Sequence, residues 1–163
     1  MFFQNEFIYS INSRKLYFIG NVYAEIELIN GDDLCQARRG EIDPDEVRKI
    51  RIIALVDMDV ANMVINENIQ ETLQLPVKDH RKVQLKNGNI TSCDLIGPLD
   101  IRFENRHTIC QAYVLPGNSE PILGLIPFGG MDVVIDPAQQ KLVVNPKHPD
   151  GAIFRTGKLV IVQ

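Results

Sequence analysis

Residues 49–65 read KIRIIALVDMDVANMVI, two apolar runs joined by a loop that starts with a carboxylate. Ile50–Val56 is aliphatic except for Arg51, a composition that suits a strand covered on both faces. The run ends at Asp57, and the second run begins at Met63. A carboxylate at the end of a buried strand is costly unless it is paired, hydrogen-bonded or used in chemistry. Asp57 is therefore either a loop residue that binds backbone N–H groups or a functional group.

The composition is that of an ordinary globular domain. With 163 residues, 45% of them hydrophobic and 23% charged, the chain can bury one core. A net charge of −4 without a dense Lys/Arg stripe argues against nucleic acid as a partner. No apolar run reaches the roughly 20 residues of a membrane-spanning helix, and the first residues lack a signal-peptide pattern, so no membrane partner is expected. Cys35, Cys93 and Cys110 are widely spaced and are interpreted as reduced thiols, which predicts a cytoplasmic protein.

Alternating runs separated by turn residues predict nine or ten short strands. Val22–Leu28 alternates as a half-buried strand does, and the turn Asn30–Asp33 follows it. The strongest local signal is Asn87-Gly88 between the runs Val83–Leu85 and Ile90–Cys93, which predicts a two-residue hairpin turn with positive φ. Further strands are expected at Leu34–Arg39, Leu99–Phe103, Thr108–Leu115, Met131–Ile135, Lys141–Val144 and Leu159–Val162. Residues 1–19 are either one or two edge strands or an extension.

Helical signals are few. Asn66 is a good N-cap for a short helix over Glu67–Leu75, which Pro76 ends. Asp43-Pro44 with Glu46 forms either a turn or one capped helical turn. The expected fold class is therefore all-β with one short helix.

The order of these features resembles a known family. A strand ending in ALVD, a VI run, a short helix, an Asn-Gly hairpin, Ile122-Leu123-Gly124 and MDVVIDPAQQKLVVNP follow one another as in the retroviral-type (retropepsin-like) aspartic proteases of the small bacterial kind. The resemblance covers residues 20–146, which would be the protease domain. Residues 1–19 would then be an N-terminal extension, and residues 147–163 a C-terminal tail that completes an interface, extends an edge or has no fixed structure.

The resemblance implies a closed acid-protease-like β-barrel that works as a homodimer, with a peptide or protein as substrate and no cofactor or metal. Asp57 would be the catalytic aspartate, one from each subunit. The hairpin around Asn87-Gly88 would be the flap over the substrate. Ile122-Leu123-Gly124 would be the hydrophobic-hydrophobic-Gly element that packs beneath the active-site loop.

The loop after the aspartate departs from the family pattern. Family members read Asp-Thr/Ser-Gly, whereas this chain reads Asp57-Met58-Asp59. Met58 cannot make the hydroxyl hydrogen bond that cross-links the two loops, and Asp59 places a side chain where glycine allows close approach. In a dimer, Asp59 would also bring four carboxylates together and alter the titration of the catalytic pair.

Three alternatives to a working aspartic peptidase follow from this loop. The scaffold could have lost catalysis and kept dimerisation or peptide binding. The pattern Asp57-Met58-Asp59-Val60 also matches the DxDx(V/T) start of haloacid-dehalogenase-type phosphatases, although their fold requires long helices that this chain lacks. A Mg²⁺ or Ca²⁺ site formed by carboxylates at the dimer axis is a further variant.

The remaining polar residues predict no chemistry. His107 and Cys110 are three apart on an expected strand, so they face opposite sides and cannot share a metal. His80 and His148 are interpreted as solvated, and Asp136 before Pro137 as a turn residue.

Overall fold

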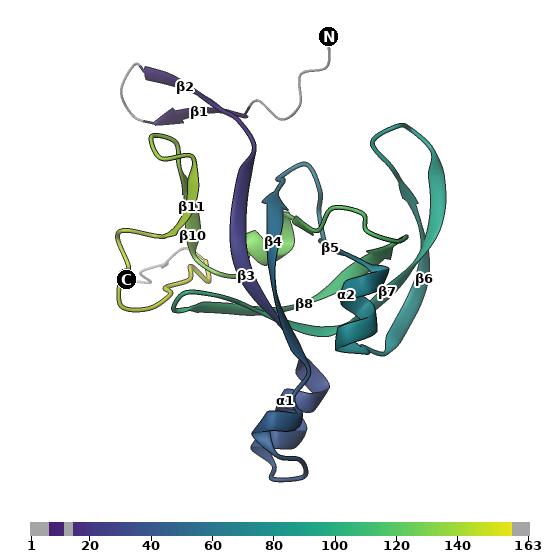
Figure 1. The fold of residues 1–163 in the computed structure, drawn as a ribbon. Helices are drawn as coiled ribbons and strands as arrows, with labels where there is room; N and C mark the ends of the chain where they lie inside the picture. Colours follow the sequence, from purple (N-terminus) through teal and green to yellow (C-terminus); the bar gives the residue numbers. More distant parts are fainter. Residues whose placement is uncertain (1–6, 12–14, 158–163) are drawn as a thin grey trace, which may run out of the picture.

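The computed structural model describes residues 7–11 and 15–157, and it is mostly β (Figure 1). The described part contains eleven strands, slightly more than expected. They are β1 Phe7–Ile11, β2 Lys15–Ile19, β3 Val22–Asn30, β4 Lys49–Val56, β5 Met63–Asn66, β6 Val77–Gln84, β7 Ile90–Phe103, β8 Arg106–Leu115, β9 Ile122–Leu123, β10 Val133–Asp136 and β11 Lys141–Val144. The helices are α1 Gly31–Arg38, the 3₁₀ turn η1 Pro44–Glu46, α2 Glu67–Leu73 and α3 Leu125–Gly129.

Seven strands form the main sheet in the order β3-β4-β9-β5-β8-β7-β6. Because β3 also pairs with β7, the pairings from β3 to β7 close on themselves, and β6 lies outside this ring as a partner of β7. Most neighbours are antiparallel, but β4 with β9 and β5 with β8 are parallel. Two small antiparallel hairpins, β1–β2 and β10–β11, stand beside the main sheet (Figure 1).

The hydrophobic core is formed mainly by side chains of the main sheet. The inward side chains of β3 are Val22, Ala24, Ile26 and Leu28, so the alternation predicted for this strand is confirmed. The same cluster includes residues of β4, β5 and α2, namely Ala54, Val56, Met63, Ile65, Ile69 and Leu73. Burial of this apolar surface is the main favourable contribution to folding.

The prediction that β4 is covered on both faces is correct only for its second half. Ala54, Leu55 and Val56 are buried, but exposure alternates over Lys49–Ile53, and Ile53 is 65% exposed. The first half of the strand therefore has one solvent-facing side. An aliphatic run alone cannot distinguish these two environments, since β-branched residues also favour exposed strand positions.

The expectation of a single helix was wrong, because α1 stands where a turn and a strand were predicted. Asn30 caps this helix by accepting a hydrogen bond from the Asp33 N–H at 3.0 Å. The Asp33 carboxylate is buried and receives two side-chain hydrogen bonds from Arg48, each 2.8 Å long. A second bond joins Asn30 to the Leu73 carbonyl at the end of α2. These tertiary contacts hold a helix that has almost no apolar face.

The positions predicted for the other two helical segments are confirmed. Asn66 caps α2 and accepts from the Ile69 N–H at 2.9 Å, although the helix ends at Leu73, two residues earlier than predicted. Gln74 follows in the left-handed conformation that commonly ends a helix. Asp43 and Glu46 form the capping box of η1, so that segment is a helical turn.

The Asn-Gly hairpin exists as predicted, but its turn has three residues. The Leu85 N–H donates to the Asn89 carbonyl at 2.8 Å, and the Gly88 N–H donates to the Leu85 carbonyl at 2.9 Å. Gly88 has a φ of 84°, whereas Asn87 is not among the residues with positive φ. This is the geometry of a longer hairpin loop with glycine in the left-handed position. β6 also begins earlier than expected, at Val77, and most of its side chains are exposed.

A buried polar network holds residues 145–153 against the body of the protein. The Arg106 side chain is fully buried and donates to the backbone carbonyls of Asp132 at 3.1 Å and His148 at 2.5 Å. The Asp132 carboxylate accepts from Asn145 Nδ2, from His148 Nδ1 and from the Ile153 N–H. His148 is therefore hydrogen-bonded within the protein rather than solvated, so the prediction made for it was wrong.

Asp132 is expected to make folding sensitive to acid. The hydrogen bond from the Ile153 N–H, followed by that from Asn145, lowers the pKa of Asp132 from 3.8 to about 2. Because the pKa is lower in the folded state, this contribution is complete above about pH 4 and is lost as the pH falls towards 2. As the pH is lowered from about 4 to 2, the urea midpoint of the Asp132→Asn variant should therefore fall less steeply than that of the natural chain. Asparagine also tolerates the φ of 53° at this position.

The matched control removes one exposed carboxylate instead. Asp45→Asn on η1 should leave the acid dependence as it is in the natural chain. An unchanged slope in Asp132→Asn would show that this carboxylate does not contribute.

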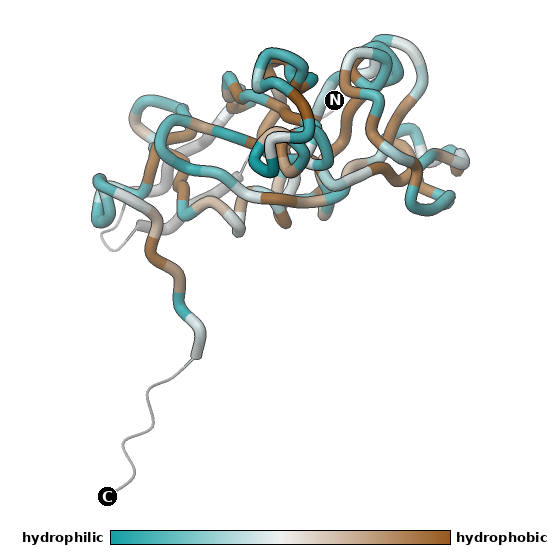
Figure 2. The backbone as a smooth tube through the Cα atoms, turned by 90° about the horizontal axis from the view of Figure 1, so that it is seen from below, coloured by the Kyte–Doolittle hydropathy of each residue, from teal (hydrophilic) through white to brown (hydrophobic). Residues whose placement is uncertain are grey.

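The ends of the chain are separate from the main sheet. The sequence allowed either edge strands or an extension in residues 1–19, and the described part of this segment contains the strand pair β1–β2. After the Asp132 network, the described chain extends away from the body (Figure 2), and Ile153 and Phe154 are largely exposed. The predicted strand Leu159–Val162 lies outside the described residues. No helix in the described part is long and apolar enough to cross a membrane.

Candidate functional site

Asp57 follows β4 directly and is buried, with 2% of the residue exposed. Its backbone N–H donates to the Leu123 carbonyl at 3.1 Å, and its Oδ1 accepts from the Asp59 N–H at 3.0 Å. The Val60 N–H closes the turn on the Asp57 carbonyl at 3.3 Å. The carboxylate thus binds loop backbone, as the first reading of the sequence expected, and is also held in one orientation, as a functional group requires.

Ile122-Leu123-Gly124 packs against this loop. Ile122 and Leu123 pair in parallel with Leu55 and Val56, which places the chain after β9 beside residues 57–62. The N–H groups of Leu125 and Ile126 donate to the carbonyls of Val60 and Ala61, both at 2.8 Å.

Glycine is required at position 124 by close approach of backbone. A Cβ atom there would lie 2.2 Å from the Asn62 carbonyl oxygen and 2.5 Å from that of Val60. Real Cβ atoms do not approach oxygen this closely, so only glycine lets the two segments touch. Ile122-Leu123-Gly124 therefore packs closely against the loop that follows Asp57.

The two unusual loop residues have different surroundings. Met58 is half-buried and packs against the hydrophobic core, which explains how a long apolar side chain is accommodated directly after Asp57. Asp59 is exposed, and its carboxylate faces the surface. The loop is therefore compatible with the fold as it stands.

A cavity of about 380 Å³ lies between the loop, the β6–β7 hairpin and the end of β8. Of the residues singled out from the sequence, Asp59 and Ile122 are among its lining; Asp57, Met58, Asn87 and Gly88 are not. The full lining is Asp59, Val60, Val64, Val83, Gln84, Leu85, Lys86, Tyr113, Leu115, Ser119, Glu120 and Ile122. Most of the exposed lining surface is apolar, and its charged groups are Asp59, Glu120 and Lys86.

Several of these lining residues were missed from the sequence. Tyr113 and Leu115 are on β8, and Glu120 is in the segment before β9. Glu120 lies close enough to Tyr23 to raise the pKa of that phenol, and Tyr113 bonds Arg81 of the hairpin and raises the pKa of the guanidinium. No local pattern marks these positions, because only the pairing of β5 with β8 and β9 brings them to the loop.

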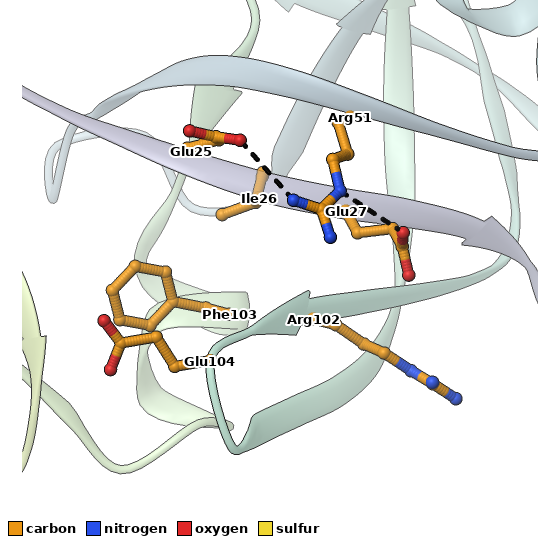
Figure 3. A pocket seen from close by; sticks show the side chains of 7 residues that line it. All are labelled: Glu25, Ile26, Glu27, Arg51, Arg102, Phe103 and Glu104. Atoms are coloured by element: carbon orange, nitrogen blue, oxygen red, sulfur yellow. Dashed lines mark ion pairs between the residues drawn. The ribbon is translucent and has the colours of Figure 1, made fainter.

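A second cavity, of about 440 Å³, lies between β3, β4 and β7 (Figure 3). Arg51 pairs with Glu25 and Glu27, both at 3.7 Å, while the Arg102 side chain points away from this pair. Ile26, Phe103 and Glu104 complete the lining. Because Arg51 already pairs with two of the three glutamates of this lining, we assign no chemistry to the cavity.

The described residues contain no group of three or more His, Cys, Asp or Glu side chains that could hold a metal ion. Cys35, Cys93 and Cys110 are free, and burial raises the pKa of Cys110 to about 12 and also raises that of Cys93. Neither of these two thiols is suited to act as a nucleophile, since the thiolate is the reactive form.

Comparison with protein families and with curated proteins gives no relative. No family model matches the chain, and no curated protein is similar enough to be counted as one. The function must therefore be argued from the site.

Proposed function

We propose that the protein is an aspartic-type endopeptidase of the homodimeric retropepsin-like kind, in which Asp57 activates water for peptide hydrolysis. The observation that carries the proposal is the position of Asp57. Asp57 is buried directly after β4, its backbone N–H donates to the Leu123 carbonyl and its carboxylate accepts from the Asp59 N–H. The next loop residues, Asp59 and Val60, line a cavity beside the β6–β7 hairpin. An arrangement of this kind suits an extended peptide substrate.

The chemistry needs a second carboxylate. Hydrolysis of a peptide by aspartates requires two of them to share one proton, so that one acts as base and the other as acid. We propose that a second copy of this chain supplies the second Asp57. The proposal also includes that the ring of strands β3-β4-β9-β5-β8-β7 is the closed barrel of the acid-protease fold, and that the β6–β7 hairpin with Asn87-Gly88 at its turn is the flap.

The second candidate is a scaffold that binds peptides without cutting them. Met58 and Asp59 favour this reading, because Met58 offers no hydroxyl to join two loops and Asp59 adds negative charge next to the proposed catalytic pair. The phosphatase alternative gains no support, since the chain after Asp57 consists of strands, hairpins and short helices. A cytoplasmic location, expected from the three free cysteines, stays part of the proposal.

Asp57→Asn is expected to abolish peptide cleavage, with a loss of at least about a hundredfold, because the amide can neither take up nor release the proton. The measurement is cleavage of an unstructured protein by the purified full chain between about pH 4 and 7. The fold should persist, because the asparagine oxygen can still accept from the Asp59 N–H.

The matched comparison restores the family loop in Met58→Thr/Asp59→Gly. Cleavage by the natural chain that disappears in Asp57→Asn would establish the peptidase. Cleavage only by the restored loop would support the peptide-binding candidate. If no variant cuts although each is folded, the peptidase proposal is wrong.

A further inference from the structure

We infer that the cavity beside Asp59 is a specificity pocket for a long aliphatic side chain that ends in a positive charge, that is, for lysine or arginine in the bound peptide. This inference rests on the proposed function, because it takes the cavity to be the place where a substrate side chain enters.

The walls of the pocket fit the aliphatic part of such a side chain. Val60, Val64 and Ile122 come from the loop, β5 and β9, while Val83 and Leu85 come from the hairpin. They form an apolar lining on both sides of a space of about 380 Å³. Burial of each methylene of a ligand against such a surface is favourable, and lysine and arginine commonly bury their stems while the charged end stays in a polar environment.

The polar part of the lining fits the charged end. Asp59 and Glu120 both line the pocket, and both are exposed, so their carboxylates meet the ligand in the presence of water. Each of these side chains carries a carboxyl group, the complement of a cationic ligand end. Two carboxylates at an apolar pocket distinguish an ammonium or guanidinium group from a neutral or negative end of the same length.

Two neighbouring side chains, Tyr23 and Lys86, affect the negative charge of the pocket. The effect of Glu120 on the pKa of Tyr23 places its carboxylate near the phenol. Lys86 opposes the two carboxylates from the hairpin side, where it also lines the pocket and is exposed. The net charge of the described lining is therefore −1, and removal of Lys86 should make the pocket more selective for cations. Arg81, bonded to Tyr113 and Asp79, is the other cation near this wall.

The test uses peptides that differ at one residue only: lysine, arginine, norleucine or glutamate, in an otherwise uncharged sequence. Norleucine has the lysine stem without the charge. Binding is measured by fluorescence anisotropy at pH 7 with the full-chain Asp57→Asn variant, which cannot cut, and cleavage is measured in parallel with the natural chain.

We expect lysine and arginine peptides to bind about fivefold or more tightly than the norleucine peptide, and the glutamate peptide to bind most weakly. In the Asp57→Asn background, adding Asp59→Asn or Glu120→Gln should each reduce the lysine-to-norleucine ratio several-fold. Adding Lys86→Gln should raise the ratio. Glu41→Gln, which removes an exposed carboxylate after α1, should leave it unchanged.

A lysine-to-norleucine ratio near one, or a ratio that neither carboxylate variant changes, would overturn the inference and leave the peptidase proposal intact. Lysine preference in binding without cleavage by the natural chain would overturn the peptidase proposal alone. If no peptide binds, both are wrong.

Discussion

Replacing Arg106 by methionine is expected to lower the free energy of unfolding by about 3–5 kcal/mol. The guanidinium is fully buried, donates to the carbonyls of Asp132 and His148, and lies 3.8 Å from the Asp132 carboxylate. Methionine fills similar space but leaves these buried acceptors unpaired, and an unsatisfied buried polar group costs more than an ordinary hydrogen bond contributes.

Urea denaturation of the two proteins measures this difference, with equal m-values confirming that the unfolding transition is comparable. The matched control is Arg51→Met, because that arginine is 73% exposed and makes ion pairs at 3.7 Å. Such pairs contribute about 0–1 kcal/mol, so the control should change little. A loss below about 1 kcal/mol in Arg106→Met would show that the network does not hold residues 145–153.

Gly124→Ala is the second substitution with a large expected effect. The added methyl group would overlap the backbone oxygens of Asn62 and Val60, and backbone cannot give way as a flexible side chain can. Overpacking of this kind costs about 1–3 kcal/mol and occasionally more, and we expect a value at or above the upper end. Because the displaced segment is the loop after Asp57, peptide binding and cleavage should fall even at a temperature where the variant stays folded.

Gly129→Ala is the control for this variant. It lies at the end of the same helix, α3, and a Cβ atom there meets nothing within 4 Å. Its free energy of unfolding should stay within about 1 kcal/mol of the natural chain, because an alanine in a helix is favoured over glycine by about that amount. Equal stability of the two alanine variants would contradict the close approach described for Gly124.

The features that depend on neighbouring residues could be predicted from the sequence. Asn66 and the start of α2 were found because the N-cap interaction spans three residues. The hairpin around Gly88 was found because Asn-Gly between alternating runs is a local signal for a turn with positive φ. The number of residues in that turn was not found, since it depends on how β6 and β7 align.

The features that depend on distant contacts were predicted less well. The N-terminal end of helix α1 is fixed by the bonds of Asp33 with Arg48 and of Asn30 with Leu73, which are 15 and 43 residues apart in the chain. The order Asn30, Asp32, Asp33 is a cap followed by acidic residues, a signal that would have favoured a helix over the strand. β6 was assigned too short because its exposed, charged side chains show no apolar face, and its backbone pairing with β7 is what makes it a strand.

The candidate site also contains both residues that the sequence located and residues that it did not. Asp57 and Ile122-Leu123-Gly124 were located by their order along the chain, and the structure brings them together. The pocket wall with Tyr113 and Glu120 was not anticipated, because it is created by the parallel pairing of β5 with β8 and by the short strand β9.

The pairing of β3 with β7 has a consequence for how the protein folds. Asn30 must meet Leu99 before the ring of strands can close, and the intervening chain contains β4, β5 and β6. Closing such a long loop loses chain entropy before any contact across it compensates for the loss, so folding should be slow, in the millisecond-to-second range typical of non-local β topologies. On the ribosome, the first strands would stay incomplete until β7 has been synthesised, and a nascent chain stalled before that point should be open to proteases.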